Sequence, residues 1–184
     1  GIISDIGTVV NVGNVATLTI DAESSGTDIE LDQESVEYTS LDTSKAVVEG
    51  RKVTFIAAGT VKIESLVAEK KNTITFTVYS VPQGLKLSAV LSDYDKGYLE
   101  TGDESTLTVK TSEGNVSPEY LEFKSSNTKV ATVDDQGKVL AGAKGSATIT
   151  ATVMNDPGKR KVTFAVKVEN RVAKSLTVDV ENNA

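Results

Sequence analysis

The chain has 184 residues, a formal net charge of −7, and neither cysteine nor histidine. Without these residues there are no disulfides, thiol nucleophiles or thiolate metal sites, and the commonest general base is missing, so we do not expect an enzyme. The negative charge disfavours nucleic acid as a partner, and no apolar run reaches the ~20 residues that span a bilayer, so we expect no membrane insertion. The chain opens at Gly1 without a methionine, and we expect it to be a piece of a longer protein.

Short segments in which apolar and polar residues alternate recur along the chain. In chain order the clearest are 17–20, 74–78, 106–109, 147–153 and 162–168, rich in valine, isoleucine and threonine. Strict alternation with one polar face is typical of antiparallel strands that cover a core on one side. Turn-forming or charged residues at 49–51, 69–72, 134–137 and 155–158 separate the strands. The pattern predicts an all-β sandwich or barrel.

The same blocks occur twice in the same order. Residues 57–63 resemble 143–149, residues 17–20 resemble 106–109, and residues 74–78 resemble 162–166, with nearly constant spacing. A duplicated module with small loop insertions explains this arrangement. We expect one module over 1–80, a second over 84–170, and a tail or the first strand of a truncated third module over 171–184.

Residues 123–152 contain a long ordered motif. It reads aromatic-x-Ser-Ser-Asn from Phe123, then Val-Ala-Thr-Val, an acidic turn ending in Gly137, and Lys-Gly-x-Ala-x-Ile-x-Ala around Gly145. The serine and asparagine side chains are expected to cap a turn. This motif closely resembles the group 2 bacterial immunoglobulin-like domain, directly over 84–170 and through the internal repeat over 1–80, where the first copy is diverged. The resemblance implies two tandem immunoglobulin-like β-sandwich domains with no catalytic residues.

The resemblance also implies a setting, because such domains occur in bacterial surface-layer proteins, adhesins and phage surface proteins. We expect non-catalytic spacer modules of a self-assembling surface-layer (S-layer) protein, located extracellularly at the cell wall. The expected partners are other copies of the same protein in a lattice, or neighbouring modules of the same chain. The alternatives are the stalk or binding segment of an adhesin or phage surface protein, and a carbohydrate-binding module.

Four carboxylates near the start of the second module are candidate calcium ligands: Asp93, Asp95, Asp103 and Glu104. Calcium takes about six to eight oxygen ligands, and these residues lie close together in the sequence. Their spacing does not match the EF-hand loop. A solvated acidic loop is the competing interpretation, and no other cofactor is expected.

Two further features have a structural and a functional interpretation. A glycan platform needs exposed aromatic rings, for which Tyr79, Tyr94, Tyr98 and Tyr120 are the candidates. The basic run 159–161, like the lysines at 70 and 71, is expected on a hairpin loop as a solvated end. The functional alternative for these basic residues is contact with an anionic cell-wall polymer.

Overall fold

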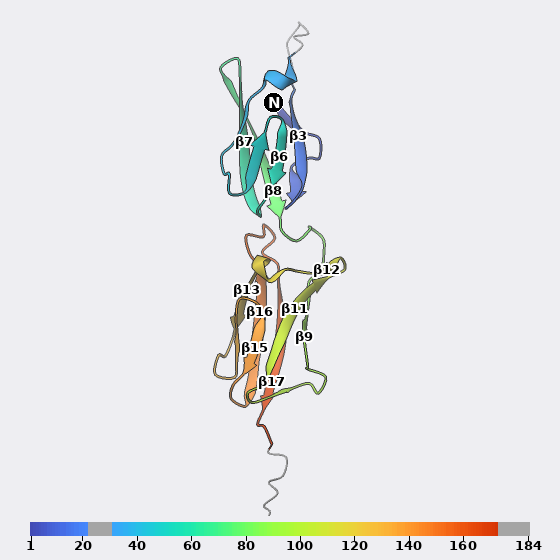
Figure 1. Cartoon of the computed structure of the whole chain (residues 1–184), viewed down its shortest axis with the longest axis vertical. Helices are drawn as coiled ribbons and strands as arrows, with labels where there is room; N and C mark the ends of the chain where they lie inside the picture. Colours follow the sequence, from blue (N-terminus) through green and yellow to red (C-terminus); the bar gives the residue numbers. More distant parts are fainter. Residues whose placement is uncertain (22–30, 173–184) are drawn as a thin grey trace, which may run out of the picture. The chain divides into compact units, whose positions relative to one another are not determined.

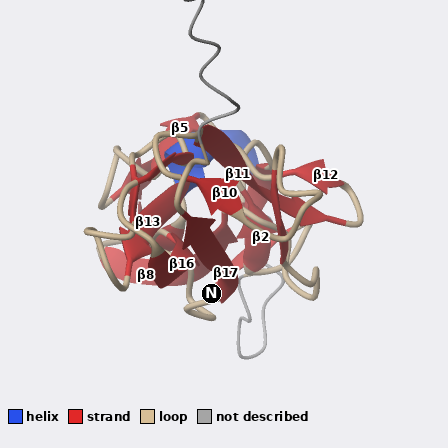
Figure 2. Cartoon of the chain, turned by 90° about the horizontal axis from the view of Figure 1, so that it is seen from below, coloured by secondary structure: helices blue, strands red, loops and turns tan. Residues whose placement is uncertain are grey.

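The computed structural model describes residues 1–21 and 31–172. Strands and loops make up nearly all of this part, with two short 3-10 turns (Figures 1 and 2). The chain divides into two compact units: residues Gly1–Lys86 with Thr152–Lys161, and Leu87–Ala151 with the residues from Val162 onward. The division at Lys86 lies near the predicted boundary between the modules 1–80 and 84–170. The predicted tail or third-module strand over 171–184 lies, from residue 173 on, outside the described residues.

The first unit contains two four-stranded sheets. One has the order β1 (Ile2–Ser4), β3 (Val15–Ile20), β6 (Lys52–Phe55), β5 (Ala46–Glu49). The other has the order β2 (Val9–Asn11), β8 (Lys70–Tyr79), β7 (Gly59–Val67), β4 (Tyr38–Ser40). The 3-10 turn η1 (Gln33–Ser35) precedes β4.

The second unit repeats this plan. One sheet has the order β12 (Gly114–Asn115), β11 (Glu104–Thr111), β15 (Lys138–Ala141), β14 (Ala131–Val133), with β9 (Ser88–Leu91) paired to β11. The other has the order β10 (Leu99–Glu100), β17 (Lys161–Glu169), β16 (Gly145–Val153), β13 (Leu121–Ser125). The 3-10 turn η2 (Pro118–Tyr120) precedes β13.

The two units share the details of their hydrogen bonding. A short parallel pair, β2 with β8 and β10 with β17, joins the early edge strand to the last strand in each. Leu18 N–H donates to the Arg51 carbonyl at 2.8 Å, and Leu107 N–H donates to the Gly137 carbonyl at 2.8 Å. The architecture is all-β, with immunoglobulin-like sandwiches as predicted.

Each unit has a hydrophobic core of its own. In the first, alternate residues of β7 and β8 point inward, and the rings of Phe55 and Phe76 lie 4.7 Å apart between centroids. In the second, Leu107, Val139 and Ile149 are almost completely buried. Burial of each such side chain contributes about 1.5–3 kcal/mol, which is why the alternating segments fold as strands.

One predicted loop is wrong. Strands β7 and β8 are joined by the two residues Ala68 and Glu69, whose φ angles of 46° and 62° are those of a tight hairpin turn. Lys70 and Lys71 therefore belong to β8. The turn contains no glycine or asparagine, and the polar run after it faces solvent, so the sequence resembles a longer loop. The predicted turns at 134–137 and 155–158 are present.

Candidate functional site

Two of the four predicted calcium ligands are engaged by cations. Asp103 accepts a hydrogen bond from the Glu100 N–H at 2.8 Å, and its other oxygen contacts the Arg171 guanidinium. The Glu104 carboxylate lies 2.8 Å from the Lys138 ammonium, a hydrogen bond that raises the pKa of that lysine. Asp103 and Glu104 therefore each have a cationic side chain as a partner.

The other two carboxylates lie in the connection between β9 and β10. Asp93 has a φ of 53°, a turn conformation that aspartate tolerates well, and Asp95 follows it on the exposed side. Within residues 1–21 and 31–172, no three or more acidic side chains come together in a metal-binding group. Calcium binding at Asp93, Asp95, Asp103 and Glu104 stays a prediction.

The aromatic side chains are used for packing. All nine are buried or half-buried. Tyr94 packs edge-on against Phe164 at 5.3 Å between centroids, and its hydroxyl accepts a hydrogen bond from the Lys167 N–H at 2.9 Å. Tyr79 is buried. Of the four tyrosines proposed for a glycan platform, Tyr79 is thus unavailable, while Tyr94, Tyr98 and Tyr120 are half-buried.

The hydroxyls of the Ser-Ser-Asn motif are also structural. Ser125 donates to the Ala131 carbonyl at 2.7 Å and accepts from the Asn127 N–H at 3.2 Å. The Asn127 side chain accepts from the Lys129 N–H at 3.2 Å. The predicted turn cap is confirmed. The hydroxyls of Ser125 and Ser126 both hydrogen-bond to backbone groups.

Arg160 lies among backbone acceptors rather than in solvent. Its guanidinium makes a two-point contact with Asp156, at 2.7 and 3.0 Å, and donates to the carbonyls of Val81 at 2.6 Å and Pro82 at 3.0 Å. It also lies over the ring of Tyr79, 5.6 Å from the centroid. The prediction that the basic run 159–161 is solvated is therefore wrong for Arg160. All of these residues belong to the first unit.

Asp156 is the counterion that holds this arginine. Its side chain is completely buried, and that of Arg160 is 21% exposed. Burial would raise the pKa of Asp156, but hydrogen bonds from the Arg160 side chain and backbone outweigh it and hold the pKa below the usual range. Both groups are therefore charged at neutral pH, and the pair fixes the loop to residues 79–82. Sequence reasoning missed this pair, although the i, i+4 spacing of Asp156 and Arg160 is a weak signal for it.

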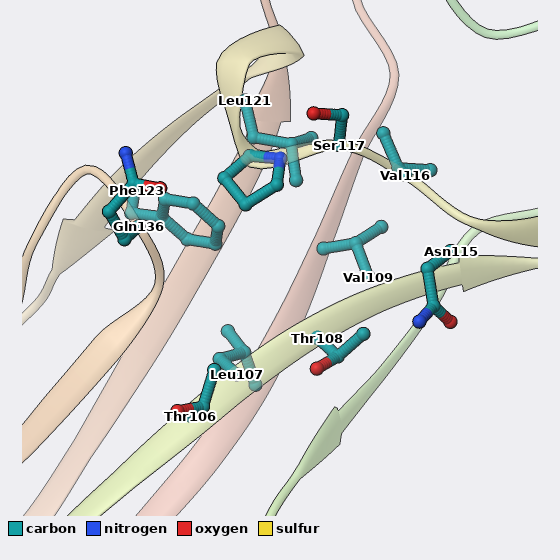
Figure 3. A pocket seen from close by; sticks show the side chains of 11 residues that line it. Thr106, Leu107, Thr108, Val109, Asn115, Val116, Ser117, Leu121, Phe123 and Gln136 are labelled. Atoms are coloured by element: carbon teal, nitrogen blue, oxygen red, sulfur yellow. The ribbon is translucent and has the colours of Figure 1, made fainter.

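The second unit contains a pocket beside β11. Its volume is about 310 Å³, and it lies between β11, the segment that leads into η2, and the start of β13 (Figure 3). Its floor is apolar, with hydroxyl and amide groups at the rim. The lining residues are Thr106, Leu107, Thr108, Val109, Asn115, Val116, Ser117, Pro118, Leu121, Phe123 and Gln136. No motif in the sequence pointed to this pocket.

Comparison with known proteins finds a matching family model and similar solved structures. The family model of the bacterial Ig-like domain (group 2) matches residues 93–166. Similar solved structures include domains 4 and 5 of the S-layer protein SbsC, at 22% identity over 91% of this chain and 96% of that one, with a TM-score of 0.36. The longer S-layer structure rSbsC(31-844) is 24% identical over 84% of this chain, with a TM-score of 0.34, and the match covers only 23% of that protein.

A third similar structure is the C-terminal 282-residue fragment of intimin, solved in complex with the intimin-binding domain of the translocated intimin receptor. It is 15% identical over 91% of this chain and 62% of that one, with a TM-score of 0.36. No curated protein sequence matches the chain. No helix in the described part of the chain is long and apolar enough to cross a membrane.

Proposed function

We propose that this chain is a structural, non-catalytic segment of a bacterial cell-surface protein, because residues 93–166 match the family model of the group 2 bacterial immunoglobulin-like domain. The family match is the observation that carries the proposal. It agrees with the structure, in which the serine hydroxyls of the motif hydrogen-bond to the backbone. Two sandwiches that follow one another along the chain, each with its own core, suit a spacer. Such a unit supplies length and contact surface.

Within that class, we propose an S-layer protein, whose partners are other copies of itself at the cell wall. The acidic charge, the absence of cysteine and the repeated sandwich plan support this choice. Contacts in a lattice would come from loops and exposed strand edges, which a sandwich provides in quantity.

The test uses the full-length protein that contains this segment. Purified protein is dialysed with and without millimolar calcium and viewed by negative-stain electron microscopy. Two-dimensional sheets with a regular repeat support the S-layer proposal. Monomers or rods without a lattice contradict it and favour the stalk of an adhesin.

A second measurement tests the broader proposal separately. Antibodies raised against this segment should label intact cells, and protease added to intact cells should remove the label. If the segment becomes accessible only after lysis, the surface role itself is refuted, whatever the assembly state.

A further inference from the structure

An arginine of the first unit is held at one place on the sandwich edge. The Arg51 guanidinium donates through Nε to the Leu18 carbonyl at 3.1 Å and through Nη1 to the Glu34 carboxylate at 2.6 Å. Leu18 belongs to β3, and Glu34 is the middle residue of η1. A carbonyl and a carboxylate thus form a two-point receptor that the unit fills with its own side chain.

The second unit keeps both acceptors. Leu107 stands where Leu18 does, because each N–H donates to the carbonyl at the same point of the facing turn, Gly137 and Arg51 respectively. Glu119 stands where Glu34 does, as the middle residue of the 3-10 turn that precedes the β4 or β13 strand. The residue that matches Arg51 is therefore Gly137, which has no side chain.

The pocket beside β11 lies next to Gly137, because Leu107 and Phe123, which a Cβ at that position would meet, both line it. Residue 137 cannot fill it, because a Cβ there would lie 2.6 Å from the Leu107 carbonyl oxygen and 3.2 Å from the Phe123 ring. The next residue is Lys138, whose ammonium is held by Glu104 at 2.8 Å. Figure 3 shows Leu107 and Val109 on one side of the pocket, with Phe123 and Leu121 facing them.

The neighbouring contact of the first unit does have a replacement. There the Gln33 amide accepts from the Ile20 N–H at 2.8 Å and donates to its carbonyl at 2.9 Å. In the second unit the Val109 carbonyl accepts instead from the Val116 N–H at 2.8 Å. The β11 backbone is therefore hydrogen-bonded at Val109, whereas Gly137 supplies no side chain to replace the Arg51 guanidinium.

We propose that the pocket beside β11 binds the arginine side chain of a protein partner. The guanidinium donates to the Leu107 carbonyl, and the methylene stem packs on Phe123. The second acceptor is the carboxylate of the exposed Glu119, which follows the lining residue Pro118 in η2 and corresponds to Glu34 of the first unit. Arginine fits better than lysine because its planar fork can donate to two separate acceptors at once. The aromatic ring adds a favourable surface for the flat cation. This proposal does not depend on whether the chain belongs to an S-layer protein or to an adhesin.

The experiment is an NMR titration of the whole 184-residue chain with the peptide acetyl-Ala-Arg-Ala-amide. We expect saturable amide shifts centred on Leu107, Val109 and Gly137. The matched peptide with lysine should bind at least threefold more weakly, and the peptide with citrulline, which has the same shape without the charge, weaker still. Equal shifts for the lysine and arginine peptides, or no saturable shift at millimolar arginine peptide, overturn the proposal.

Variants separate a specific site from general attraction to an acidic protein. Glu119→Gln should weaken arginine-peptide binding about threefold, the size expected of an exposed ion pair. Glu113→Gln, an equal charge change at an exposed position of the same unit, should leave binding unchanged. Both residues are exposed, and the amide spectra report directly that each variant is folded. Equal weakening by the two variants shows non-specific attraction and refutes the site.

Discussion

Replacement of Arg160 by methionine tests the pairing of the buried carboxylate. Methionine keeps an unbranched apolar stem but removes the two contacts to Asp156 and the two hydrogen bonds to the carbonyls of Val81 and Pro82. It leaves a carboxylate whose side chain has no exposure to water. The variant therefore tests a charge without a counterion rather than a change in packing.

The expected cost follows from that burial. Removal of one partner from a buried ion pair typically destabilises a protein by about 3–5 kcal/mol. Because the Arg160 side chain is 21% exposed, water can reach part of the site, and we expect the lower end, about 3 kcal/mol. Hydrogen exchange of the slowest β8 amides measures the free energy of unfolding of the first unit directly.

The stability deficit of Arg160→Met should depend on pH, and the pKa of Asp156 fixes the direction of that dependence. In the wild type the pKa of Asp156 is held low, so its contribution is present at neutral pH and is lost as the pH falls through the lowered pKa. In Arg160→Met the side-chain hydrogen bonds to Asp156 are lost, while the backbone N–H groups of residues 160 and 158 still donate to it, so burial moves the pKa of Asp156 upward from its wild-type position. The carboxylate of the variant therefore takes up a proton at a higher pH than that of the wild type, and the deficit of the variant should shrink as the pH is lowered.

Two results would refute this reasoning. One is a deficit below about 0.5 kcal/mol at neutral pH, the range of ordinary surface substitutions. The other is a double variant, Asp156→Asn with Arg160→Met, that is less stable than Arg160→Met alone. The double variant leaves no charge buried, so it should recover part of the loss.

Three other predictions concern the rest of the chain. Gly145→Ala should cost about 1–3 kcal/mol in urea unfolding of the second unit, because φ is +152° and the new Cβ would lie 2.8 Å from a Val130 methyl; an unchanged midpoint would contradict this. Hydrogen bonds from Lys144 and Lys167 lower the pKa of Glu169 to about 2, so its stabilising effect should be lost only as the pH falls from its ordinary range towards 2. In an NMR titration Lys144→Ala should move that pKa upward, whereas an unmoved midpoint would exclude the ion pair. If the four predicted carboxylates bind calcium, millimolar calcium should raise the melting temperature above that in EDTA; equal melting temperatures would refute the site.

The sequence determined the strand pattern and the repeat because both depend on local chemistry. The alternation of apolar and polar residues along β16 and β17 predicts which face of each strand is buried. The turn before β15 is predicted by its own residues, Asp-Asp-Gln-Gly, which are adjacent in the sequence. The internal repeat was found by comparing the sequence of one half of the chain with that of the other. The hairpin at Ala68 was missed because its turn residues carry no turn signal.

The tertiary structure decided what the charged residues do. Arg160 contacts carbonyls nearly 80 positions earlier in the chain, and Asp103 meets Arg171 from the far end of the unit. Position 137 matches Arg51 only when the hydrogen bond from β11 is known. A sequence pattern records which residues are apolar and how they are spaced. Which distant acceptor a cation reaches depends on how the sheets pack, and only the folded chain fixes that.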